Sequence, residues 1–429
     1  MEISLFSASA VFPGALPHPV FIMTSLGPIF ADDLARVKPG DRLRLTISAQ
    51  TSDAAALAQA ALEARARGER VLVVCADPAD VPRLAQEMPW FEPNLDVRPL
   101  PDWETLPYDV LSPQEELVSE RLEALYRLTA PTGGADVLLT SAVTASQRLS
   151  PVSYIGANTF FFHQGEQISL TTLQKRLAAA GYANVKQVLA AGEFAVRGSI
   201  VDVFPMGSER PFRLDFFDDE IESIRWFDVD TQRSMESAKE IRLLPGHEFP
   251  VDPEALLAFR QRWRREFAGD PKKSIVYCDI EKEILPPGIE YYLPLFFDET
   301  AALTDYLPPN ARVFLLGDIE AALQAFGRDM ASRYKVLAAD PQRPALAPER
   351  IWLKPEEFFK SLANFARFTV EKKENAEDLK RLTGIEVDRK SQNPVGKLLE
   401  RTRESAMKGV RTLIAAPSAG RMETMSQLL

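Results

Sequence analysis

The run Arg70-Val71-Leu72-Val73-Val74-Cys75 ends at Ala76-Asp77-Pro78 and holds five consecutive apolar residues. An apolar run of this length, bounded by turn residues, is typical of a strand that is buried on both faces of a parallel sheet. Residues 136–140 form a second such run, and the alanine-rich residues 54–67 predict a helix. Buried strands that alternate with helices predict an α/β domain with a doubly wound parallel sheet.

The pattern changes between residues 158 and 244. One short helix is predicted over residues 169–181, and the remainder shows the alternation of β-structure with turn residues between the strands. We therefore expect a small α+β domain inserted into the α/β domain. Mixed patterns resume after it, with a buried strand predicted at residues 312–316 and helices on either side of it.

A predicted helix start and the end of the chain add further segments. Ser112-Pro113-Gln114-Glu115 predicts a helix start, with Ser112 as the N-cap and Glu115 in a capping box. A strand at residues 411–416, a turn and the start of a helix end the chain inside an α/β unit, as expected for the front of a longer protein. The predicted division is residues 1–30 as a disordered leader, 31–157 as the first part of the α/β domain, 158–244 as the inserted domain, 245–370 as the part that completes the module, and 371–429 as a charged linker (371–375) and the first part of a third α/β domain.

Composition excludes several classes of protein. The net charge is −11, and residues 193–233 carry five arginines against ten acidic residues, so this region is a poor surface for DNA phosphates. The two cysteines and three histidines are scattered, without the spacing of a zinc site. No apolar run reaches the ~20 residues of a membrane helix, and residues 1–22 make a poor signal peptide. We expect a cytoplasmic protein without a metal.

One predicted hairpin has an unusual polar face. Alternation along residues 212–217 places Arg213, Asp215 and Phe217 on one side of a strand. Residues 218–220 then form a turn, and 221–228 return as a second strand. An aromatic beside an arginine suits a protein-binding hot spot. Alternatively, Phe217 covers a sheet edge and Arg213 pairs with Asp215 or Glu222; the spacing alone leaves both readings open.

Several strings together resemble the N-terminal part of the bacterial transcription-repair coupling factors (Mfd). They span residues 40–370, and residues 371–429 match more weakly. The matching strings are Asp102-Trp103-Glu104-Thr105-Leu106-Pro107-Tyr108-Asp109, residues 192–198, Asp202-Val203-Phe204-Pro205-Met206-Gly207-Ser208-Glu209, residues 213–221, Phe227-Asp228-Val229-Asp230, Leu243-Leu244-Pro245 and Gly288-Ile289-Glu290-Tyr291. The same region is more distantly similar to the excision repair protein UvrB.

The resemblance implies a helicase-like α/β module interrupted by a small domain that docks on UvrA. Carried over by position, the residues that contact UvrA are Arg197, Arg213 and Phe217. In the family, the RNA polymerase-binding domain and the motor that moves on double-stranded DNA with ATP and Mg²⁺ lie beyond residue 429. The resemblance also implies that a C-terminal domain masks the docking face. The expected role is recruitment of UvrA to RNA polymerase stalled at a DNA lesion.

The nucleotide-binding elements of UvrB are degenerate in this chain. A phosphate-binding loop needs glycines, a lysine and a Ser or Thr, whereas the strand at 42–47 is followed by Ser48-Ala49-Gln50-Thr51-Ser52-Asp53. The second ATPase element needs an Asp-Glu pair, and Gly317-Asp318-Ile319 stands in its place. We therefore expect no catalytic residue and no cofactor in this chain.

Two other functions remain as alternatives. One is a UvrB-like, ATP-dependent damage-recognition subunit, which the degenerate loop disfavours. The other is a standalone DNA-binding protein, which the acidic composition disfavours. Aromatic residues between the first strands could stack on bases, but core packing at a domain boundary is the favoured interpretation. These residues are Trp90, Phe91, Trp103 and Tyr108.

Overall fold

The computed structural model describes residues 4–7, 36–47, 50–130, 134–372, 393, 395–408, 413–416, 423–424 and 427. They belong to two compact units, which are described separately. One unit is Pro28–Glu374, and the other joins Met1–Gly27 to Asn375–Leu429. Within the described ranges, no helix is long and apolar enough to cross a membrane.

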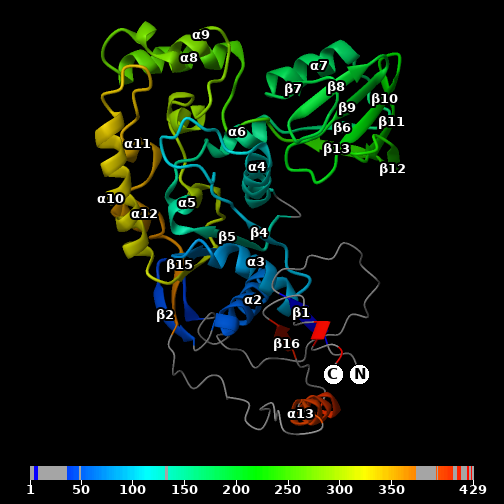
Figure 1. Ribbon diagram of the computed structural model, residues 1–429, viewed down its shortest axis with the longest axis vertical. Helices are drawn as coiled ribbons and strands as arrows, with labels where there is room; N and C mark the ends of the chain where they lie inside the picture. Colours follow the sequence, from blue (N-terminus) through cyan, green and yellow to red (C-terminus); the bar gives the residue numbers. More distant parts are fainter. Residues whose placement is uncertain are drawn as a thin grey trace. The chain divides into compact units, whose positions relative to one another are not determined.

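A six-stranded parallel sheet organises the larger unit (Figure 1). Four of its strands precede the inserted domain, and two follow it. In spatial order the strands are β2 (Arg42–Ile47), β15 (Ala366–Lys372), β14 (Arg312–Leu316), β3 (Val71–Cys75), β5 (Val137–Ser141) and β4 (Val97–Pro99). This sheet confirms the predicted α/β class, and β2 and β14 have the predicted bounds.

Helices cover both faces of the parallel sheet because its central strands are apolar on both sides. Val71 and Val73 of β3 pack with α2 (Gln50–Ala66) and α3 (Asp80–Phe91). Leu72 and Val74 face the opposite way. The helices on that side are α4 (Glu115–Thr129), α5 (Ala142–Ser146), α10 (Ile319–Leu337) and α12 (Pro355–Ser361). This arrangement is the doubly wound sheet that the sequence predicts.

The inserted domain is built on a second, mixed sheet, drawn in green in Figure 1. Helix α7 (Leu170–Ala179), capped by Ser169, packs against one face of it through Leu173 and Leu177. In spatial order the strands are β12 (Ser234–Ala238), β11 (Glu220–Phe227), β10 (Phe212–Phe217), β9 (Ile200–Val203), β8 (Glu193–Arg197) and β7 (Ala183–Asn184). Beside it, β6 (Phe160–His163) pairs with β13 (Glu240–Leu243).

The residues after the insert first form an aromatic-rich helical cluster, which contacts the strand-to-helix loop that holds Trp103. Trp103 is buried there, and Tyr108 packs on Tyr291 and Trp352. Core packing is therefore confirmed for these two aromatics. The helices of this cluster are α8 (Pro253–Glu266), η1 (Pro271–Lys273), α9 (Ile275–Glu281), η2 (Ile289–Leu295) and α11 (Pro348–Ile351). Two other short helices belong to the core that includes Leu72 and Val74: α6 (Val152–Ala157), which precedes the insert, and η3 (Leu303–Tyr306).

The smaller unit contains two short strands and a helix. Strand β1 (Ser4–Ser7) runs parallel to β16 (Leu413–Ala416), and α13 spans Gly396–Met407. The prediction of a disordered leader is wrong for Ser4–Ser7, because pairing with β16 gives their backbone groups hydrogen-bond partners. The rest of residues 1–30 and the predicted turn at 417–420 lie outside the described residues.

Two local predictions are also wrong. Helix α4 begins at Glu115, with Gln114 rather than Ser112 as the N-cap. The Ser112 hydroxyl instead donates to Glu290 Oε2 at 2.8 Å and accepts from the Gly288 N–H at 3.0 Å. Ser112 thus forms hydrogen bonds with residues distant in sequence instead of capping the helix. Glu371 and Lys372, expected in a linker, extend β15 because they pair with β2; the rest of that linker is not described.

Candidate functional site

The candidate residues lie on the face of the inserted sheet opposite α7, which we call the outer face. Pairing across the strands places Arg213 of β10 directly opposite Asp202 of β9 and Arg225 of β11. Directly paired residues project to the same face. Leu214, one residue further, lies opposite Val201 and Ile224, and all three are buried on the α7 side.

Phe217 ends strand β10 and is the most exposed candidate. It lies opposite Glu220 across a tight turn whose first residue, Asp218, has a φ of 52°. The side chain is 69% exposed. The prediction of an exposed Phe217 is therefore confirmed, and the alternative in which it covers a sheet edge is wrong. Phe217 lies four residue steps along the strand from Arg213, or roughly 13 Å at the usual rise.

Arg213 is more enclosed than expected. Its Nε donates to Asp202 Oδ1 at 2.7 Å and its Nη2 to Asp202 Oδ2 at 3.0 Å. Its Nη1 donates to the Gln232 carbonyl and the Ser234 hydroxyl, both at 3.2 Å, and the guanidinium lies 4.9 Å from the Phe227 ring centre. The side chain is only 16% exposed. The hydrogen bonds to Asp202 raise the pKa of Arg213.

The expectation of an exposed Arg213 is therefore wrong, and so is the alternative that pairs it with Asp215 or Glu222. Asp215 instead accepts from the Ser223 hydroxyl at 2.9 Å. The register explains both results, since it places Asp202 of the neighbouring strand directly opposite Arg213. Local spacing along one strand cannot reveal a partner that another strand supplies.

Arg197 ends strand β8 and shares the same carboxylate. Its Nη2 donates to Asp202 Oδ2, while 49% of its side chain stays exposed. Asp202 is fully buried. The structure thus brings Arg197 and Arg213 together around one carboxylate. Phe217 lies further along strand β10 from Arg213.

Sequence reasoning missed two residues of this face, Asp202 and Arg225. Asp202 interrupts the apolar strand Ile200–Val203, and a carboxylate in such a strand signals a buried pair. Arg225 is exposed, and no carboxylate of the described residues lies within ion-pair distance of it. The outer face thus presents arginine donors and one aromatic ring, a combination suited to carboxylates beside an apolar cavity.

A crevice of about 710 Å³ lies at the carboxyl ends of the parallel strands, where open α/β sheets bind ligands. Its charged lining is Arg44, Asp77, Asp80, Asp318, Glu320 and Glu371. Arg44 is paired with Glu371 at 3.2 Å, and Asp318 caps α10 by accepting from the Ala321 N–H at 3.0 Å. Five carboxylates against one paired arginine make this edge repel a phosphate.

The expected degenerate loop leads into this edge. Ser48 and Ala49 lie outside the described residues, and Gln50 to Asp53 form the first turn of α2. The Asp53 carboxylate is buried and accepts from Arg83 at 2.8 and 3.0 Å. This carboxylate therefore occupies the helix start that holds phosphate in nucleotide-binding loops. Among the described residues, no group of three His, Cys, Asp or Glu side chains is arranged to hold a metal ion.

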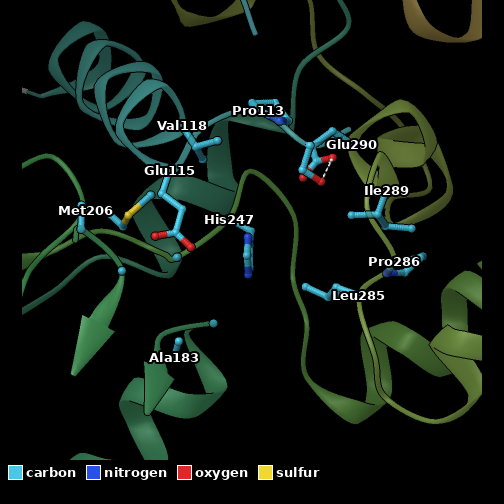
Figure 2. A pocket seen from close by; sticks show the side chains of 15 residues that line it. Pro113, Glu115, Val118, Ala183, Met206, His247, Leu285, Pro286, Ile289 and Glu290 are labelled. Atoms are coloured by element: carbon cyan, nitrogen blue, oxygen red, sulfur yellow. Dashed lines mark hydrogen bonds between the residues drawn. The ribbon is translucent and has the colours of Figure 1, made fainter. Parts of the chain in front are cut away.

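A smaller pocket of about 250 Å³ lies where the inserted domain meets the rest of the unit (Figure 2). Figure 2 shows Glu115 and Met206 on one side of His247, with Leu285 and Ile289 on the other. Burial lowers the pKa of His247 to about 4. The lining holds no lysine or arginine, so the pocket does not suit an anion.

Glu290 also lines this pocket and connects it to the aromatic-rich cluster. Its side chain is buried, and Ser112 donates to its Oε2. Burial raises the pKa of Glu290 to about 7. This carboxyl group therefore titrates near neutral pH.

Comparison with known proteins identifies the inserted domain. Residues 160–249 match the family model described as the UvrB interaction domain. The chain is 42% identical over 298 residues to the transcription-repair-coupling factor of Escherichia coli (strain K12), a match that covers 69% of this chain and 26% of that protein. The corresponding protein of Haemophilus influenzae is 38% identical over 368 residues, which cover 83% of this chain and 31% of that protein. The chain thus spans less than a third of the length of these relatives.

Proposed function

We propose that this chain, which is homologous to the N-terminal region of the transcription-repair-coupling factors and contains a UvrB interaction domain, docks the repair protein UvrA on the outer face of that domain. In this role it brings UvrA to RNA polymerase stalled at a DNA lesion, in the bacterial cytoplasm. In this proposal, contacts with the polymerase and DNA, and ATP-driven translocation, belong to parts of the relatives' length that residues 1–429 do not match.

The observation that carries the proposal is the exposure of Phe217 beside arginines in the matched domain. A side chain of this size that is 69% exposed leaves a large apolar area in water. Aromatic rings and arginines dominate the binding free energy of protein interfaces. Arg197 and Arg225 expose guanidinium groups on the same face, so the proposed partner surface offers carboxylates around an apolar cavity that receives Phe217.

The parallel sheet acts in this proposal as a scaffold rather than as an ATPase. Phosphoryl transfer requires a positioned triphosphate and a metal ion. The acidic lining of the carboxyl-edge crevice and the Asp53–Arg83 pair at the start of α2 support the absence of this chemistry. Both strengthen the docking function against a UvrB-like ATPase.

The test is the affinity of the chain for purified UvrA, measured for Phe217→Ala and for a matched control, Phe161→Ala. Phe161 belongs to the same domain and is 42% exposed, but it lies on strand β6 of the separate two-stranded sheet. We expect Phe217→Ala to lose about 2 kcal/mol of binding free energy, the size of a hot-spot truncation. Equal affinities for wild type and Phe217→Ala, or an equal loss in the control, would place the binding surface elsewhere.

A further inference from the structure

We propose that Asp202 is a positioning residue of the outer face, whose buried carboxylate holds Arg197 and Arg213 in the conformation that the partner recognises. The inference rests on the proposed docking function and adds a residue that contacts the partner only through its neighbours. Asp202 is fully buried, so it cannot itself form part of the contact surface.

The hydrogen bonds of Asp202 fix both guanidinium groups. Oδ1 accepts from Arg213 Nε, and Oδ2 accepts from Arg213 Nη2 and from Arg197 Nη2. A fork in which two parallel N–H groups bind one carboxylate is rigid as well as strong. A buried carboxylate without donors is unstable, so Asp202 requires the fork from Arg213. Arg197 adds one further bond and is held by it.

This arrangement prepares the face for binding. A free arginine side chain samples many rotamers. The conformational entropy that it loses when association restricts it to one rotamer weakens the complex. Arg197 is anchored at one nitrogen while half of its side chain remains in solvent. Its guanidinium is therefore already held in one place before a partner arrives. Arg213, which uses its other donors on Gln232 and Ser234, supports the same carboxylate from the opposite side.

Charge makes a positioning role distinguishable from a purely electrostatic one. Arg197, Arg213 and Asp202 together carry one positive charge, and Asp202→Asn would raise it to two. If the arginines acted only through their field, this variant would associate faster with an acidic partner surface. If Asp202 positions them, the variant dissociates faster despite the added charge.

The experiment measures association and dissociation rates of the full chain with UvrA for Asp202→Asn and for a control, Asp215→Asn. Asp215 lies on the same face and its substitution adds the same charge, but its hydrogen bond goes to Ser223. We expect Asp202→Asn to dissociate about tenfold faster and Asp215→Asn to dissociate at the wild-type rate. Wild-type dissociation from a folded Asp202→Asn, confirmed by its melting temperature, would overturn the inference.

A second measurement covers the case in which Asp202→Asn does not fold. Guanidinium NMR of the wild-type chain reports the order of each arginine side chain. We expect Arg197 and Arg213 to be ordered and Arg176, exposed on α7, to be mobile. An Arg197 as mobile as Arg176 would contradict positioning. If Phe217→Ala weakens UvrA binding while Asp202→Asn does not, the docking function stands and only the role of Asp202 fails.

Discussion

The outer face of the inserted sheet and the carboxyl edge of the parallel sheet use their charged side chains in opposite ways. At the carboxyl edge, Asp318 caps a helix, Asp53 binds Arg83, and Arg44 binds Glu371. These groups satisfy internal needs of the fold. On the outer face one buried carboxylate, Asp202, holds arginines that remain partly in solvent, and Phe217 is left largely exposed.

The difference shows why a binding surface is recognised by the groups that the fold leaves available. The carboxyl edge has the position of a ligand site in an α/β sheet, but its donors and acceptors are already used. The outer face has an ordinary position on a small sheet, yet it exposes an aromatic ring and guanidinium groups. Available side chains, rather than position in the fold, distinguish the candidate site.

The largest effect is expected at the junction between the inserted domain and the α/β domain, which carry the two surfaces. Arg121 of α4 is fully buried and donates to Glu248, just after the insert, at 2.6 Å. It also donates to the Pro101 carbonyl and to Gln147. Arg121→Met leaves the Glu248 charge buried without its cation, although Trp103 Nε1 still donates to it at 3.1 Å, and should cost about 3–5 kcal/mol of unfolding free energy, measured by urea denaturation. A double variant that also carries Glu248→Leu should recover most of this loss, and a loss below ~1 kcal/mol in the single variant would contradict the coupling.

The second prediction concerns Glu290, which lines the pocket between the inserted domain and the rest of the larger unit. Its pKa is raised to about 7 in the folded chain, so the unfolded chain ionises it at lower pH and stability falls as pH rises from about 4.5 to 7. Glu290→Gln removes this loss and should gain roughly 3 kcal/mol at pH 8 and nothing at pH 4.5. Thermal unfolding of both proteins across this range measures the difference. A pH-independent difference between them would show that the carboxyl group ionises alike in both states.

The third prediction separates the two arginines of the outer face. Arg213→Ala removes the fork to Asp202 and the bonds to Gln232 and Ser234, and should cost about 2 kcal/mol of stability, as lost hydrogen bonds to charged groups do. Arg197→Ala removes one bond from a half-exposed side chain and should stay within ~0.5 kcal/mol. The free energies of unfolding of both variants, measured by denaturant titration, test this prediction. Equal losses would mean that Arg213 is no more structural than Arg197.

The smallest effect is expected at the carboxyl edge. A nucleotide at a hundred times its dissociation constant stabilises a protein by about 2.7 kcal/mol, whereas millimolar MgATP should change the stability of this chain by less than ~0.5 kcal/mol. Melting temperatures with and without MgATP, and an ATP turnover assay, measure this. Turnover that disappears when residues 48–53 are replaced would instead support the UvrB-like ATPase.

Local sequence patterns predicted the parts of the fold that depend on local burial. The apolar strands β3 and β14 and the short helix α7 are examples. Strand alternation also placed Phe217 on the polar face of its strand, because this property belongs to a single strand, but it left the exposure of the ring open. Its proposed role as a contact residue came from family resemblance and remains a prediction.

Predictions failed where a distant residue competes with the local pattern. Ser112 leaves its expected cap position because Glu290 and Gly288 offer hydrogen bonds. Arg213 turns to Asp202, which only the register of the sheet brings opposite it. The pairing of Ser4–Ser7 with β16 likewise joins opposite ends of the chain. No single-segment pattern contains this information.

Hydrogen exchange of the full chain, with and without UvrA, tests the central comparison most directly. The proposed docking surface predicts added protection of backbone amides in strands β8 to β11, and none at the carboxyl ends of β3, β14 and β15. Protection confined to the carboxyl ends of the parallel strands, or no change in the inserted domain at saturating UvrA, would contradict it.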